Sequence, residues 1–195
     1  MPKYWLMKTE PETFGIDDLE RVRIEPWTGV RSVFARFHMR AMEVGDEVLF
    51  YHSSCEPPGV AGLARVVKTK VIDETQFDPA SKYFDEKATR EKPIWDCVEV
   101  EFVEKLPYFV SLAHIRAEPE LQHMKLLQIG RLSVMPVEEA EYRHIVAMGH
   151  VEPKPLPEPI KVARKPKAAK KKTAKTAKAA KTARAKKPPK KKHKR

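Results

Sequence analysis

The sequence predicts an α+β, barrel-like domain over residues 1–150, followed by a disordered basic tail over residues 151–195. Short runs with strand character alternate with short helical segments as far as Met148, and this mixture is typical of small α+β barrels. All three Trp, five Tyr, eight Phe and seven Gly precede residue 151. They are enough for one hydrophobic core, so a single domain is expected.

The first elements along the chain are a strand and two short helices. Residues 4–8 read as a short strand, which the following Pro11 stops. A helix is expected around residues 16–19, where two acidic residues suit a helix N-terminus. Ser32 is placed to cap a second helix. Its apolar side is expected to consist of four residues: Val33, Phe34, Phe37 and Met42.

The remainder of the domain is predicted to build the sheet and close it with helices. Strands are expected over residues 47–52, 60–70, 95–103 and 131–137. Residues 71–92 are polar and read as a long excursion, with Tyr83 and Phe84 packed back on the body. Helical turns are expected over residues 111–115 and 119–127, and a closing helix over residues 137–148.

The positive charge is confined to the tail. Residues 151–195 contain 19 Lys and Arg against two Glu, a charge of +17, whereas residues 1–150 contain 19 basic and 25 acidic residues, a charge of −6. So dense a basic segment repels itself and cannot bury enough apolar surface to fold. It favours a polyanion, for which nucleic acid is preferred over anionic lipid. The Lys, Ala and Pro composition resembles that of linker-histone tails.

Common catalytic and metal-binding motifs are absent from the sequence. There is no GxGxxG, GxxxxGK[ST] or HExxH string, and no Cys or His pair has zinc-ligand spacing, so no metal or cofactor is expected. His52 and Ser53 are adjacent in a predicted strand and therefore point to opposite faces, which argues against a nucleophile–base pair and against an enzyme. Cys55 and Cys97 form no CxxC pair, and no apolar leader precedes the domain. A reducing location is expected, cytoplasmic or nucleoid-associated in a bacterium and nuclear in a eukaryote.

Several short strings give the domain a specific resemblance. They are YWLMKTEP at residues 4–11, WTGVR at 27–31, FYHSSCEPPGVAGLARVVK at 50–68, YFD at 83–85, PIWDCVEV at 93–100 and GRLSVMPV at 130–137. In this order and spacing they resemble the EVE domain, over residues 3–148. EVE domains belong to the PUA-like superfamily and are similar to YTH and ASCH domains. The resemblance implies a small pseudo-barrel that binds RNA, DNA or a modified base.

A site for one extruded base needs an aromatic wall, fixed polar groups and a cation near the phosphate. The similarity to YTH domains places a wall at Trp27 and a base-edge contact at Lys8 and Thr9. At the end of the strand over residues 47–52, His52 and Ser53 are expected to face the site, with Tyr51 in the core. Arg31, Arg131 and Ser133 complete the predicted site.

Each of these residues also has a purely structural interpretation. Trp27 fits a core position under a loop equally well, and Trp95, a possible second wall, is favoured as a core residue. Arg31 and Arg131 are equally suited to ion pairs with the acidic body. Ser32 stands where the family more often has Asn, which leaves one expected hydrogen bond open.

The function predicted is recognition of a flipped or unpaired modified base by the domain, with the tail adding affinity for the backbone. Two alternatives remain. One is an architectural, linker-histone-like protein with the domain as a scaffold, and the other is a nucleotide-processing enzyme. The sequence does not distinguish DNA from RNA, name the base or give the oligomeric state.

Overall fold

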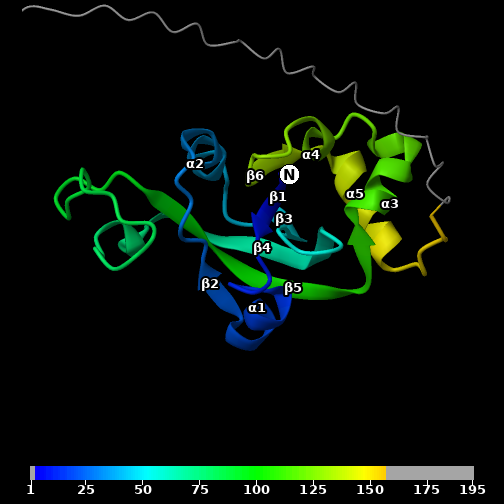
Figure 1. Ribbon diagram of the computed structural model, residues 1–195, viewed down its shortest axis with the longest axis horizontal. Helices are drawn as coiled ribbons and strands as arrows, with labels where there is room; N and C mark the ends of the chain where they lie inside the picture. Colours follow the sequence, from blue (N-terminus) through cyan, green and yellow to red (C-terminus); the bar gives the residue numbers. More distant parts are fainter. Residues whose placement is uncertain (1–2, 157–195) are drawn as a thin grey trace, which may run out of the picture. The chain divides into compact units, whose positions relative to one another are not determined.

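The computed structural model describes residues 3–156, which form one six-stranded sheet and five α-helices (Figure 1). The α+β class is therefore confirmed. The strands are β1 (Tyr4–Thr9), β2 (Ile24–Pro26), β3 (Glu47–His52), β4 (Gly59–Ile72), β5 (Asp96–Ser111) and β6 (Val134–Val137). The helices are α1 (Ile16–Val22), α2 (Val33–Arg40), α3 (Leu112–Ala117), α4 (Lys125–Gln128) and α5 (Glu139–Gly149), with single 3-10 turns at Glu74–Gln76 and Pro119–Leu121.

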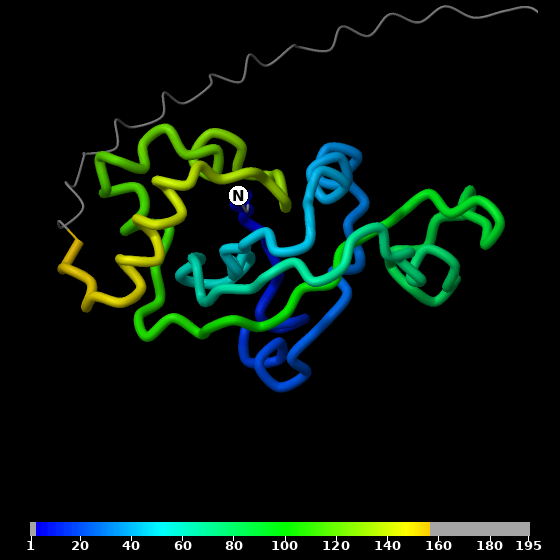
Figure 2. The backbone as a smooth tube through the Cα atoms, turned by 180° about the vertical axis from the view of Figure 1, so that it is seen from behind, coloured from blue at the N-terminus to red at the C-terminus, as the bar shows by residue number. Residues whose placement is uncertain are grey.

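The sheet has the strand order β2-β5-β4-β3-β1-β6. β1 and β3 run parallel and every other neighbouring pair is antiparallel. β4 and β5 are the two longest strands of the sheet, and they pair with each other (Figure 2). The parallel pair matters for function, because it brings the carboxyl ends of β1 and β3 side by side.

Both faces of the sheet are covered, and the central strands are apolar on both sides as a result. In β1, Trp5 and Met7 join one core cluster while Leu6 joins the other. In β3, Leu49 and Phe50 divide in the same way. Helices α1 and α2 contribute to the first cluster, and α3, α4 and α5 to the second.

Strand β5 is longer than the sequence predicts. The predicted strand ends at Val103, and beyond that end lies Pro107, a residue type that interrupts a ladder. The strand continues to Ser111 because the pairing shifts there: Gly62 of β4 faces Lys105, whereas Val60 faces Val110. The proline sits in this irregular stretch, where no regular ladder hydrogen bond is lost.

Helix α2 buries the side opposite to the one predicted from the sequence. Ser32 caps it, with Oγ accepting from the Ala35 N–H at 3.4 Å. The buried residues are Ala35 and Met39, and Met42 beyond the helix end is also buried. The expected apolar side is exposed, with Val33, Phe34 and Phe37 at 62%, 77% and 69%.

Between β4 and β5 the chain leaves the sheet in a long excursion, drawn on the left of Figure 1. The Gln76 side chain holds the two ends of this excursion together. The Gln76 amide donates to the carbonyls of Asp73 and Trp95 at 2.8 and 2.7 Å, and accepts from the N–H groups of Ile94 and Trp95 at 2.8 and 2.9 Å. The excursion is thus anchored to the strand ends that it connects.

After α5, residues 151–154 run beside α3, where the Lys154 carbonyl lies 3.2 Å from Nε2 of His114. The predicted disordered tail otherwise lies outside the described residues. Within residues 3–156, no helix has both the length and the hydrophobicity to cross a membrane.

Candidate functional site

A cleft of about 890 Å³ opens where the ends of β1 and β3 meet the loop before α2 and the loop before β6. This volume lies in the range of sites for drug-sized ligands. Seven of the eight predicted site residues line the cleft: Lys8, Thr9, Trp27, Arg31, Ser53, Arg131 and Ser133. The fold therefore brings together segments that are more than 120 residues apart in the sequence.

The floor of the cleft is formed by the ends of the two parallel strands. Lys8 is paired with Tyr51 and Thr9 with His52. The Thr9 hydroxyl donates to the Phe14 carbonyl at 3.0 Å, and the Ser53 hydroxyl donates to the Thr9 carbonyl at 3.0 Å. Because their protons are used, these two oxygens offer lone pairs to an N–H of a ligand.

His52 does not line the cleft. Its Nε2 accepts from the Ile16 N–H at 3.1 Å, and its ring lies between those of Phe50 and Phe109, with centroids 5.7 and 6.2 Å away. Side chains alternate along β3, so Phe50 and His52 share one face. Burial lowers the pKa of the His52 imidazole, which suits a neutral ring that accepts a hydrogen bond.

Tyr51 takes the position that His52 was expected to hold. Its side chain lines the cleft although it is only 3% exposed. Burial raises the pKa of Tyr51 to about 12, so its hydroxyl stays protonated at neutral pH. The ammonium of Lys8 lies 5.5 Å from the centre of this ring.

Trp27 belongs to the core and lines the cleft, so both interpretations of this residue are met. Its backbone N–H donates to the Val98 carbonyl at 2.8 Å, and its ring meets Phe50 edge-on with centroids 5.3 Å apart. It is 7% exposed. Trp27 is therefore a fixed side of the cleft rather than a freely projecting ring.

A second aromatic side is Tyr83, which the site prediction did not include. It lies over Gly29, where an added Cβ would stand 2.6 Å from the Tyr83 ring and where φ is +81°. Both observations require glycine in the WTG segment. Trp95, considered as a second wall, is 8% exposed and its indole N–H donates to Asp85 at 2.8 Å. Tyr83 was detectable only through the YFD string, because nothing in the excursion's periodicity places it near Trp27.

Arg31 is tied into the excursion. Its guanidinium donates to Asp73 at 2.7 Å, to the Thr75 hydroxyl at 2.9 Å and to the Tyr83 carbonyl at 2.7 Å. Burial opposes ionisation of Asp73, but hydrogen bonds from Arg31, Thr75 and Gly29 outweigh it and lower the pKa of this carboxyl. Arg31 thus mainly orders the Trp27 loop against the excursion.

The other two cations of the predicted set differ in exposure, since Arg131 is exposed and Lys8 is half-buried. Lys8 donates to the Gly130 carbonyl at 2.9 Å, and burial lowers the pKa of its ammonium group. The backbone N–H of Lys8 donates to the Ser133 carbonyl at 2.8 Å. Arg131 is exposed and has no acidic partner within residues 3–156.

The cleft is electropositive although the body is acidic. Sequence reasoning missed two of its cations, Lys82 on the excursion and Arg116 on α3, because neither belongs to a motif. The charged lining residues are Lys8, Arg31, Lys82, Arg116 and Arg131, against Glu10 and Glu25. Because Arg31 is paired with Asp73, the balance is four cations against two acids, which still favours an anionic ligand.

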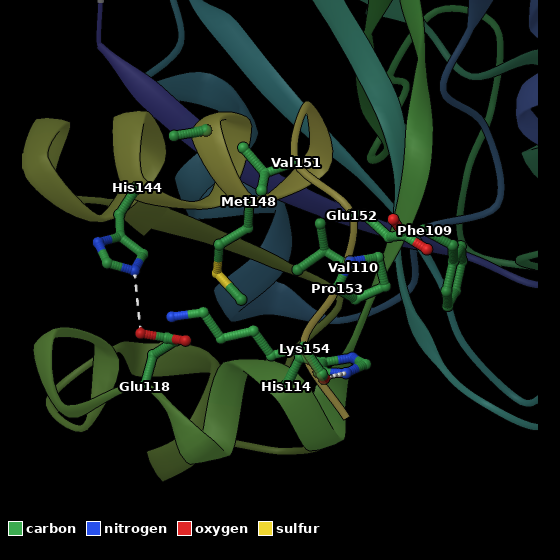
Figure 3. Close-up of a pocket in the computed structure, with 11 residues that line it drawn as sticks. Phe109, Val110, His114, Glu118, His144, Met148, Val151, Glu152, Pro153 and Lys154 are labelled. Atoms are coloured by element: carbon green, nitrogen blue, oxygen red, sulfur yellow. Dashed lines mark hydrogen bonds and ion pairs between the residues drawn. The ribbon is translucent and has the colours of Figure 1, made fainter. Parts of the chain in front are cut away.

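A smaller cavity of about 270 Å³ lies between α3, α5 and residues 151–154 (Figure 3). It contains none of the predicted site residues. His144 lies 3.4 Å from Glu118 and shares a compact cluster with Glu120, in which possible metal-ligand atoms lie within 4.8 Å of one another. The direct contact between His144 and Glu118 accounts for their arrangement without a bound ion, and the larger cleft is the better candidate site.

The model of the EVE domain matches residues 3–148. The chain belongs to the EVE domain family. Human thymocyte nuclear protein 1 is 34% identical to it over 172 residues, which cover 78% of this chain and 76% of the relative. The matched residues 3–148 include every residue that lines the cleft.

Two solved structures of relatives superpose on this EVE domain. A protein from Leishmania major is 49% identical, with a TM-score of 0.74 over 76% of this chain and 95% of the other. A structure of human THYN1 in complex with 5-methylcytosine-containing DNA is 34% identical, with a TM-score of 0.73 over 77% of this chain and 99% of the other. In this EVE domain Ser32 lines the cleft and caps α2.

Proposed function

We propose that the EVE domain binds nucleic acid and holds one modified base in the large cleft. The observation that carries this proposal is the composition of the cleft lining. The cleft combines aromatic side chains, hydroxyl acceptors and more cations than acids. A site for a base attached to a phosphate backbone needs all three. The THYN1 complex with 5-methylcytosine-containing DNA makes DNA with a modified cytosine the first ligand to test.

Each group in the cleft has a separate role in this proposal. Trp27 and Tyr83 flank the base, and the hydroxyls of Thr9 and Ser53 accept from an exocyclic amino group such as N4 of cytosine. Arg131 contacts the adjoining phosphate. A 5-methyl group adds apolar surface, which is favourable only where an apolar wall stands beside it.

Binding rather than catalysis fits the polar atoms of the cleft. The Ser53 hydroxyl is directed to the Thr9 carbonyl and the His52 imidazole to the Ile16 N–H, so these two neighbours do not form a nucleophile–base pair. The tail, with 17 net positive charges, would supply attraction to phosphates that is independent of sequence.

The test compares the intact protein on two DNA oligonucleotides that differ only in carrying cytosine or 5-methylcytosine at one position. We expect tighter binding to the methylated strand. Trp27→Phe keeps an aromatic ring in the core, so the domain should still fold. The smaller ring offers less area for stacking, so the preference for the methylated strand should fall by about fivefold, equivalent to about 1 kcal/mol.

Arg131→Ala is the matched control, because it should weaken binding to both strands equally and leave the preference unchanged. Equal affinity of the wild type for both strands, and for strands with other modified bases, would contradict the proposal and favour the architectural alternative.

A further inference from the structure

The outer face of α2 is an apolar surface with no partner among residues 3–156. Phe34 is the most exposed large apolar side chain of the described residues at 77%, Phe37 is the second at 69%, and Val33 beside them is 62% exposed. The helical period places these three on one side, opposite the buried Ala35 and Met39. Clustered exposed phenylalanines are costly in water and indicate an interaction surface.

This surface adjoins the cleft. Ser32, which lines the cleft, is the cap of α2, and Val33 and Phe34 follow directly. Helix α2 packs beside β6, and Figure 2 shows it next to the loop that enters this strand. That loop lines the cleft through Gly130 and Arg131, and its Ile129 is 48% exposed. The apolar surface of α2 therefore lies directly beside the cleft residues Ser32, Gly130 and Arg131.

The charge around this surface identifies its partner. Residues 26–42 and 121–137 contain no Asp or Glu but include Arg31, Arg36, Arg40, Lys125 and Arg131. Arg31 pairs with Asp73 and Arg40 with Asp96. The other three cations, Arg36, Lys125 and Arg131, have no acidic partner among residues 3–156, and Arg36 donates to the Ile94 carbonyl at 2.7 Å. A second copy related by a twofold axis would place this cationic face against itself, which like charges disfavour. A nucleic-acid strand offers the complement, with apolar base faces between phosphates.

We propose that Phe34 and Phe37 form a stacking platform for the bases that flank the nucleotide held in the cleft. This inference rests on the proposed function and extends it to neighbouring nucleotides. Stacking on phenylalanine requires an unpaired base, so the protein should prefer single-stranded or locally opened nucleic acid to intact duplex. Because every base has a flat face, the platform adds affinity without reading the modification.

The test uses the full chain with Phe34→Ala and Phe37→Ala combined, and single-stranded DNA carrying the fluorescent base 2-aminopurine next to cytosine or 5-methylcytosine. Both side chains are exposed, so folding should be unaffected. We expect affinity to fall by about 5- to 150-fold for each stacked base lost. The fall should be equal for both strands, and the change in 2-aminopurine fluorescence on binding should disappear.

Two further variants control the experiment. Tyr108→Ala removes an aromatic side chain that is 38% exposed in β5 and does not line the cleft, and it should change nothing. Tyrosine in place of both Phe34 and Phe37 retains the rings and should retain binding.

Unchanged affinity and fluorescence in the double alanine variant would overturn the proposal. A wild type that self-associates in light scattering, with association lost and DNA affinity unchanged in the variant, would also overturn it and assign the face to a second copy. If the wild type shows no preference for the methylated strand but the variant still loses affinity, the proposal for the cleft fails and the stacking platform stands.

Discussion

Asp73 fixes the loop that carries Trp27. This carboxylate is 1% exposed and accepts from the N–H of Gly29 at 2.9 Å, from Arg31 at 2.7 Å and from the hydroxyl and N–H of Thr75 at 2.5 and 3.0 Å. It therefore joins the cleft loop to the base of the excursion. A buried carboxylate with this many donors stabilises the fold only while it is ionised.

Asp73→Asn should lower the free energy of unfolding at neutral pH by about 3 kcal/mol, because it leaves the Arg31 guanidinium without its charged partner. The folded-state pKa of Asp73 is lowered, so its contribution is present above the unfolded value of about 3.9 and is lost as pH falls through the folded value. Thermal melts from about pH 7 to about pH 3 should show the wild type and the variant converging below about pH 4.

Asp78→Asn is the control, since that exposed carboxylate accepts a single hydrogen bond, from the Ala80 N–H at 2.9 Å. A difference between wild type and Asp73→Asn that stayed constant down to about pH 3 would show that charge is not the reason for the effect.

For single residues, the sequence predicted most of the residues that line the cleft, but it did not predict which side chains at the end of β3 face the cleft. Motif resemblance located Thr9, Trp27 and Arg131, because short strings mark these positions. Strand alternation by itself places Tyr51 and Ser53 on one face of β3, and in the structure these two residues, and not His52, line the cleft.

Among the elements, the excursion depends on Gln76, which is fully buried and makes four hydrogen bonds with the backbone. Gln76→Ala leaves two carbonyls and two N–H groups without partners. Each such group costs about 1–3 kcal/mol when it remains buried, so the excursion should open locally before the sheet unfolds. Hydrogen exchange at the amides of Ile94 and Trp95 should accelerate, together with exchange in the Trp27 loop.

Gln76→Glu separates the two halves of this network, because a carboxylate still accepts from both N–H groups but cannot donate to the two carbonyls. Protection of Ile94 that is unchanged in Gln76→Ala would show that the excursion is held by other contacts.

Element types followed from the sequence where hydrophobic periodicity was strong. The strands around Leu49 and Leu63 were predicted within a few residues, because buried strands show continuous apolar runs. β2 was missed, since Ile24–Pro26 is too short to show a pattern. The exposed face of α2 ran against the rule that phenylalanine is buried, and such an exception is expected at a binding surface.

At the scale of the whole molecule, charge and structure divide the chain into two parts. All aromatic residues and both core clusters lie within the described region, whereas residues 157–195 contain 18 Lys and Arg and one Glu. A chain that ends at Leu156 should therefore melt cooperatively at nearly the same temperature as the full chain. A large fall in the melting temperature would show that the tail supports the fold.

The central claim is that selectivity resides in the cleft and backbone affinity in the tail. The most direct measurement is a salt titration, from about 0.05 to about 0.2 M, of the full chain and of the chain ending at Leu156 on single-stranded DNA with and without 5-methylcytosine. Each phosphate neutralised adds about −0.7 to the slope of log K against log salt on single strands. If about eight tail cations engage, truncation should flatten the slope by about 5 to 6 units while the preference for the methylated strand persists. A truncated chain that keeps the steep slope, or that loses the preference, would contradict the claim.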